Sequence, residues 1–164
     1  MEKKFYSDRG MEITLTPISD ADLGFLFELY AATRAEEMSM TGWGSEDILT
    51  FLKMQFELQH IQYMKNYDNP TFDLIMAAGQ PVGRLYVNRG KDDLRIIDLA
   101  LLPQFRRQGI ARVLLESIFK ESAAANCPVS LHVERENPIM EWYCRLGFKT
   151  VREVGIYYLM TRKV

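Results

Sequence analysis

Hydrophobic and polar residues alternate along the chain with two different periods, and these periods predict the order of its helices and strands. Residues 11–16 alternate strictly, with Ile13 and Leu15 on one side, which is typical of a half-buried strand. Helical spacing of apolar residues predicts four helices, at residues 20–33, 45–66, 109–125 and 138–146. Short apolar runs bounded by turn residues predict the other strands, at residues 71–77, 82–88, 94–102, 129–133, 149–154 and 156–161.

This order of elements predicts one mixed α/β (α+β) domain built on a single sheet and spanning residues 1–164. Residues 1–10 are polar and end at a glycine, so we expect a flexible N-terminal tail or the lead into the first strand. Residues 34–45 contain two glycines and several small residues around an isolated tryptophan, so we expect an irregular connection or a broken helix there.

The predicted helix at residues 45–66 carries apolar residues on two adjoining faces. We expect one of these faces to pack into the core through Phe51, Met54, Leu58 and Ile61. The adjoining face mixes apolar and polar residues, namely Leu52, Gln55, Phe56, Gln59 and Tyr63. This second face either lines a pocket or simply widens the buried stripe.

Composition narrows the function classes. Hydrophobic residues make up 48% of the chain, charged residues 26%, and the net charge is -2, which is ordinary for a soluble protein and gives little reason to expect nucleic-acid binding. Cys127 and Cys144 are expected to be buried, and with only two histidines no metal-ligand spacing is present. The N-terminus lacks a signal-like apolar stretch and no segment is long enough to span a membrane, so we expect a cytoplasmic protein without a membrane partner.

The stretch 94–116 is an apolar run that meets a basic, glycine-containing turn and then an amphipathic helix. Backbone amides in such a turn can point the same way, and the helix dipole adds positive charge, so a phosphate group fits there. The turn lacks the Gly-Lys-Ser/Thr ending of a P-loop and the three glycines of a dinucleotide fingerprint, which disfavours ATP and NAD.

Two motifs carry a resemblance to a known family. Arg106-x-x-Gly109-x-Ala111 follows the strand, and Asn137 and Tyr143-x-x-x-Gly147-Phe148 come later. In this order they resemble the GNAT N-acetyltransferase superfamily. The resemblance implies a mostly antiparallel sheet of about seven strands, splayed in the middle and flanked by four helices. It also implies acetyl-CoA as acyl donor and no metal.

The resemblance further implies the binding residues. Main-chain groups of Leu99 and Leu101 would bind the pantetheine arm, Asn137 its amides, and Tyr143 would protonate the leaving thiolate. The pyrophosphate would lie on the loop residues Arg106, Arg107, Gln108, Gly109, Ile110 and Ala111.

The general base is a choice among carboxylates and one histidine. Glu37 and Glu36 lie between the first two helices, which in this family borders the acceptor pocket, and Arg34 at i-3 favours Glu37. Asp98 is a charged residue in an apolar strand and is expected to be a buried structural carboxylate first and a base second. His132 is a third candidate, with a satisfied histidine in the sheet as the alternative.

The sequence therefore predicts an N-acetyltransferase that moves acetyl from acetyl-CoA to a primary amine of a small molecule or peptide, by direct attack in a ternary complex. The alternative is a non-catalytic acyl-CoA-binding regulatory module of the same fold. A homodimer is expected by analogy with the family alone.

Overall fold

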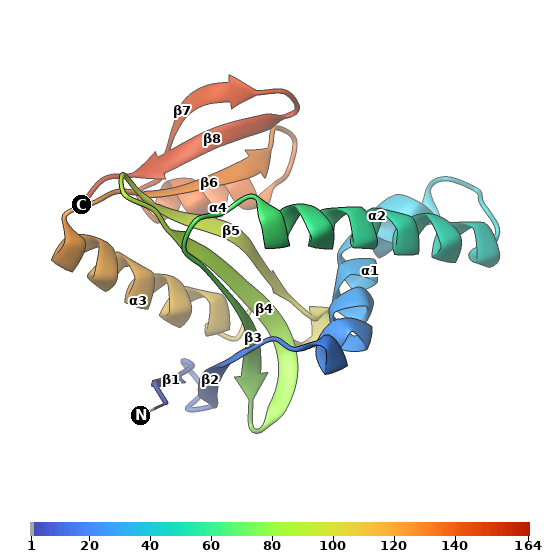
Figure 1. Ribbon diagram of the computed structural model, residues 1–164, viewed down its shortest axis with the longest axis horizontal. Helices are drawn as coiled ribbons and strands as arrows, with labels where there is room; N and C mark the ends of the chain where they lie inside the picture. Colours follow the sequence, from blue (N-terminus) through green and yellow to red (C-terminus); the bar gives the residue numbers. More distant parts are fainter. Residues whose placement is uncertain (1) are drawn as a thin grey trace.

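The computed structural model describes residues 2–164, which fold into an open sheet with helices on both of its faces (Figure 1). The eight strands of these residues lie in the order β1-β2-β3-β4-β5-β6-β8-β7. Their bounds are β1 (Lys4–Tyr6), β2 (Glu12–Pro17), β3 (Pro70–Ala77), β4 (Gln80–Arg89), β5 (Leu94–Leu101), β6 (Val129–Glu134), β7 (Lys149–Val154) and β8 (Tyr157–Arg162). The helices are α1 (Leu23–Ser39), α2 (Ser45–Lys65), α3 (Ile110–Ala125) and α4 (Ile139–Arg145), with 3-10 turns at Asp20–Asp22 and Pro103–Phe105.

All neighbouring strands pair antiparallel except β5 and β6, which are parallel. The predicted mixed α/β fold with a mostly antiparallel sheet and four helices is confirmed. None of the helices in residues 2–164 combines the length and apolar character needed to cross a lipid bilayer.

The alternation of side chains along the strands gives the sheet two hydrophobic cores. On β3, Ile75 and Ala77 belong to a large core with α3 and α4, whereas Leu74 and Met76 belong to a smaller core under α1 and α2. Neighbouring residues of a strand point to opposite faces, so the two helix pairs cover opposite faces of the sheet (Figure 1).

The sheet opens between β5 and β6. Their parallel register runs only from Leu94 opposite Val129 to Ile96 opposite Leu131, although β5 continues to Leu101. At the same place the β4–β5 register shifts, and Ile97 becomes an extra residue without a partner on β4. Such a bulge bends a strand and increases its twist. The expected splay in the middle of the sheet is therefore present.

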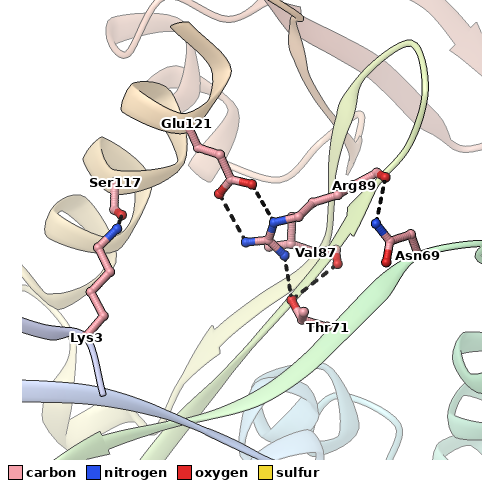
Figure 2. Close-up of polar contacts among 7 residues, drawn as sticks. All are labelled: Lys3, Asn69, Thr71, Val87, Arg89, Ser117 and Glu121. Carbon is pink, nitrogen blue, oxygen red and sulfur yellow. Dashed lines mark hydrogen bonds and ion pairs between the residues drawn. The ribbon is translucent and has the colours of Figure 1, made fainter. Parts of the chain in front are cut away.

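Polar contacts tie α3 to the sheet (Figure 2). The Arg89 guanidinium donates to both carboxylate oxygens of Glu121 at 2.5 and 3.1 Å and to the Thr71 hydroxyl at 2.9 Å. Lys3 donates to the Ser117 hydroxyl at 2.6 Å. The Arg89–Glu121 pair is about one-third exposed, so its contribution to stability is modest.

Two of the predicted boundaries are wrong. Residues 4–6 form β1, which pairs with β2 through Phe5 opposite Ile13, where a flexible tail was predicted. The first helix continues to Ser39 instead of ending near residue 33. Its last turns contain good helix formers, and Met38 is buried against the smaller core, so packing favours the helix there over an irregular connection.

The core face predicted for α2 is wrong at three of its four positions, since only Phe51 packs against the smaller core. Met54, Leu58 and Ile61 are about half exposed, at 51%, 52% and 49%. The residues that pack on the sheet are Leu52 and Phe56, which belong to the adjoining face. Both faces carry enough apolar residues to be buried, so periodicity alone did not select the correct one.

Cys144 is exposed and Cys127 is partly exposed, so the prediction of two buried cysteines is wrong. Cys144 lies on α4, a helix of only two turns that buries Tyr143. The side chain one position further along such a helix points about 100° away, here toward solvent.

Candidate active site

A cavity of about 390 Å³ lies where β5 and β6 diverge. One wall is formed by α1 and α2, the floor by β4, β5 and β6, and the far side by α4 and Tyr157 of β8. The cavity therefore joins the face of the sheet covered by α1 and α2 to the residues of α4 behind the gap.

The free edge of β5 presents backbone groups to this gap. The N–H of Leu102 donates to the carbonyl of Val82 on β4. Successive residues of a strand direct their backbone groups to alternate sides, so Leu99 and Leu101 direct theirs away from β4. Beyond Ile96 no register with β6 uses them. The Leu101 carbonyl accepts a hydrogen bond of 3.1 Å from Nε of Arg106. Arg106 therefore occupies a carbonyl that is also predicted to bind the pantetheine arm.

The predicted pyrophosphate loop lies at the start of α3, outside the residues that line the cavity. Arg107 and Gly109 both adopt left-handed backbone conformations, with φ of 59° and 81°. Gln108 is held by a 2.9 Å hydrogen bond from its side chain to the Gln104 carbonyl. Asp8 lies so close to Gly109 that a Cβ on this glycine would meet its carboxylate at 2.6 Å.

Chemically, this loop suits a phosphate group. Ile110 begins α3, so the first amides of the helix have no partner within the helix and present partial positive charge. Arg106 and Arg107 are exposed beside them. Ala111 packs against the large core, as a small residue at this position of the helix allows.

Tyr143 of α4 lies behind the gap and lines the cavity although its side chain is largely buried. Its ring packs edge-on against Phe148, with ring centres 5.5 Å apart. Burial, with the negative charge of Asp98 as a second cause, raises the pKa of the Tyr143 phenol to about 12. Tyr143 therefore keeps its proton at neutral pH.

Asn137 lies between β6 and α4 and also lines the cavity. Its side-chain oxygen accepts a 3.0 Å hydrogen bond from the backbone N–H of Ile139. It therefore satisfies an amide at the start of α4, as residues before a helix commonly do. Its amide nitrogen is not engaged by this contact.

The two predicted glutamates lie in different positions. Glu37 lines the mouth of the cavity, whereas Glu36, one residue earlier on α1, is exposed and does not line it. Arg34 contacts Glu37 at 3.3 Å, as its spacing predicted. Arg34 also contacts Glu134 of β6 at 3.7 Å, a pairing across the cavity mouth that sequence reasoning missed.

Asp98 belongs to a buried polar cluster beneath α2. It accepts hydrogen bonds from Arg84 at 2.5 Å and from the Tyr63 phenol at 3.1 Å, and Arg84 also donates to Gln59 at 2.9 Å. The expectation of a structurally paired carboxylate agrees with these contacts. Asp98 nevertheless lines the cavity, as do Leu99 and the bulged Ile97. Arg84 was not singled out as its partner, although an arginine inside the apolar run of β4 is the mark of a buried ion pair.

His132 on β6 is held by a neighbouring arginine. Its Nδ1 lies 3.1 Å from Nη1 of Arg95. An arginine only donates hydrogen bonds, so Nδ1 accepts, and the proton of the neutral ring lies on Nε2. Burial and the charge of Arg95 lower the pKa of His132. These contacts agree better with a histidine that is hydrogen-bonded within the sheet than with a general base.

Comparisons with known proteins agree with this architecture. Residues 70–150 match the acetyltransferase (GNAT) domain. The PaiA N-acetyltransferase from Thermoplasma acidophilum, solved in complex with coenzyme A, is 18% identical with a TM-score of 0.68, covering 93% of this chain and 99% of that one. The ribosomal-protein-S18-alanine N-acetyltransferase from Escherichia coli is 16% identical with a TM-score of 0.63, covering 93% of this chain and 94% of that one. Structural likeness at these identities supports the fold, and the domain match adds the family: the chain belongs to the GNAT acetyltransferase superfamily.

Proposed function

We propose that this protein transfers an acetyl group from acetyl-CoA to a primary amine, by direct attack within a ternary complex. The observation that carries the proposal is the gap between β5 and β6, where the backbone of Leu99 and Leu101 has no register with β6, and where Leu99 and Tyr143 line the same cavity. Membership of the GNAT superfamily supports acyl transfer. The coenzyme A complex of the Thermoplasma relative supports the choice of donor.

The residues present fit acetyl-CoA, which supplies an activated thioester when bound. The amides of residues 107–111 and the charges of Arg106 and Arg107 would hold the pyrophosphate at the start of α3. The N–H and C=O groups of Leu99 and the N–H of Leu101 would pair with the pantetheine arm, because that arm is itself built of amides, and the Leu101 carbonyl would do so in exchange for Arg106. Asn137 has an unengaged amide nitrogen for the same arm.

Tyr143 is the candidate to stabilise the departing sulfur. With its pKa raised to about 12, the phenol is protonated throughout the neutral range and offers an O–H donor. An ordinary thiol has a pKa of about 8.5, so complete transfer of the phenolic proton is uphill. We therefore assign Tyr143 a hydrogen bond to the developing thiolate, which takes its proton from solvent after the C–S bond breaks.

Glu37 is the base candidate at the cavity mouth, oriented by Arg34. Glu36 is the weaker candidate because it lies outside the lining of the cavity. An acceptor amine with a pKa of about 10 is almost fully protonated at pH 7, so its first proton must go to solvent or to such a carboxylate before attack.

Thiol release from acetyl-CoA tests the proposal. The protein is assayed with a panel of primary alkylamines, amino acids and short peptides with free N-termini, and each product is identified by mass spectrometry. Amine-dependent release of free thiol with an equal amount of N-acetylated amine is the expected result. Coenzyme A binding without thiol release from any amine would instead favour a non-catalytic binding module.

A further inference from the structure

The two carboxylate oxygens of Asp98 have different surroundings. Oδ2 accepts the hydrogen bonds from Arg84 and Tyr63. Within residues 2–164, no side chain or backbone amide donates to Oδ1. The Asp98 side chain is 18% exposed and lines the cavity, so its unengaged oxygen is the one available to a bound molecule.

The cluster around Asp98 fixes the position of this carboxylate. The Arg84 side chain is only 4% exposed, and its guanidinium lies over the rings of Tyr63 and Tyr86 at 5.7 and 5.0 Å. Gln59 of α2 accepts the other hydrogen bond from the same Nη2. A buried arginine that is hydrogen-bonded to one carboxylate oxygen restricts the rotamers of that side chain.

Asp98 also lies near the groups that we propose take part in the reaction. It is next to Leu99, whose backbone groups point into the gap, and its charge reaches Tyr143 strongly enough to contribute to the raised pKa of that phenol. Glu37, by comparison, lies at the mouth and is 64% exposed. Of the carboxylates lining the cavity, Asp98 is the one whose charge contributes to the raised pKa of Tyr143.

We propose that Oδ1 of Asp98 binds the acceptor amine and takes the proton that the nitrogen loses after attack, with Arg84 and Tyr63 as positioning residues. This inference rests on the proposed acetyl transfer and deepens it. The neutral amine forms a C–N bond with the thioester carbon, the C–S bond electrons leave with sulfur, and the nitrogen proton moves to Asp98. Sulfur leaves as a thiolate that accepts a hydrogen bond from Tyr143 and then takes a proton from solvent, and Asp98 returns its proton to solvent.

The same geometry indicates a substrate class. Carboxylates outnumber guanidinium groups in the lining, three against two: Asp98, Glu37 and Glu134 against Arg34 and Arg84. Both guanidinium groups are already paired with these carboxylates. A cationic amine without a carboxylate of its own therefore suits the cavity better than a zwitterionic amino acid.

Two probes test the substrate class on the wild-type protein. They are n-butylamine and 4-aminobutyrate, which differ only by the terminal carboxylate. We expect a higher kcat/KM for n-butylamine by about 10-fold or more, the size of effect that one charged contact gives. Preference for 4-aminobutyrate would overturn this part of the inference. If the protein acetylates other amines but neither of these probes, this part of the inference is overturned as well.

Substitutions test the role of Asp98. Asp98→Asn keeps the shape and removes the charge, and we expect kcat/KM for n-butylamine to fall about 10- to 100-fold while calorimetry gives an unchanged affinity for coenzyme A. The double variant Asp98→Asn/Arg84→Gln removes both buried charges and should lose the same activity without leaving Arg84 unpaired. Tyr63→Phe should raise KM for the amine several-fold with a smaller change in kcat.

Glu121→Gln is the matched control, because it also breaks an arginine–carboxylate pair, but on α3 away from the cavity (Figure 2). It should leave both kinetic constants unchanged. Wild-type KM and kcat in Asp98→Asn or in the double variant would overturn the inference and leave the proposed function standing. If the other variants fail to fold, an unchanged KM and kcat in Tyr63→Phe would also overturn the inference. If the wild-type protein releases no thiol with any amine, the proposed function itself fails, and that is visible before any variant is made.

Discussion

Gly83→Ala should damage the site without touching any proposed functional side chain. Gly83 lies on β4 opposite Leu101, and a Cβ there would meet the Ala100 carbonyl at 2.3 Å and Cα of Leu101 at 3.2 Å. Both neighbours are backbone, so no side-chain rotation relieves the contact. Real Cβ atoms almost never approach closer than 3.0 Å, so β4 and β5 must separate by about 0.7 Å at this point.

Two consequences follow from this shift. Overpacking in a core costs about 1–3 kcal/mol, so urea unfolding should give a stability lower by that amount. The displaced segment contains Leu101 and adjoins Leu99, whose backbone groups we assign to the pantetheine arm. A misplacement of about 1 Å at a reacting centre can cost up to about 100-fold in rate, so kcat/KM for acetyl-CoA should fall by about 10- to 100-fold.

Gly24→Ala is the matched control. Gly24 lies in the first turn of α1, where a Cβ would have nothing within 4 Å, and its φ is not positive. This substitution should stabilise the protein slightly, by about 0.5 kcal/mol, with unchanged kinetics. If Gly83→Ala unfolds at the wild-type urea concentration and keeps the wild-type kcat/KM, the assignment of this edge of β5 to the donor is refuted.

Four further substitutions test other parts of the account. Tyr143→Phe should lower kcat by about 100-fold with unchanged calorimetric affinity for coenzyme A. Because the pKa of the Tyr143 phenol is raised to about 12, ionisation of Tyr143 should not lower the wild-type rate at any pH below that value. A decline of the rate from this ionisation at lower pH would contradict the assignment. Gly109→Ala requires an alanine at φ 81° against the Asp8 carboxylate, so coenzyme A affinity measured by calorimetry should drop about 10-fold or more, and an unchanged affinity would remove the loop from the binding site. Two substitutions test the orientation of α2. Leu58→Gln should change the free energy of unfolding by less than about 0.5 kcal/mol, whereas Phe56→Ala should lower it by about 3–5 kcal/mol. A larger loss for Leu58→Gln than for Phe56→Ala would mean that the other face of the helix is buried.

Much of the fold could be predicted because local patterns and tertiary packing agree along most of the chain. The alternation at residues 11–16 and the helical period of residues 109–125 each offer only one apolar face, so the buried side follows from the sequence. The helix α2 offers two, and which face meets the sheet depends on the shape of the small core that Leu74 and Leu26 form with it. That information is not local.

The candidate site divides in the same way, into parts that local motifs predict and parts that depend on tertiary structure. The loop at Gly109 and the position of Tyr143 were predictable from short motifs, because a left-handed turn before a helix and a helix-ending Gly147-Phe148 leave marks in sequence. The buried cluster of Asp98, Arg84 and Tyr63 was not, because its members come from β5, β4 and α2 and are up to 35 residues apart. Only the fold brings them together, and a bulge at Ile97 sets the direction of Asp98.

Initial-velocity kinetics test most directly the claim that acetyl passes straight from the donor to the amine in a ternary complex. Rates are measured while acetyl-CoA is varied at several fixed concentrations of the acceptor amine. Direct attack in a ternary complex predicts double-reciprocal lines that intersect. Parallel lines would mean that an acetylated enzyme carries the group between two separate half-reactions, and would contradict the account.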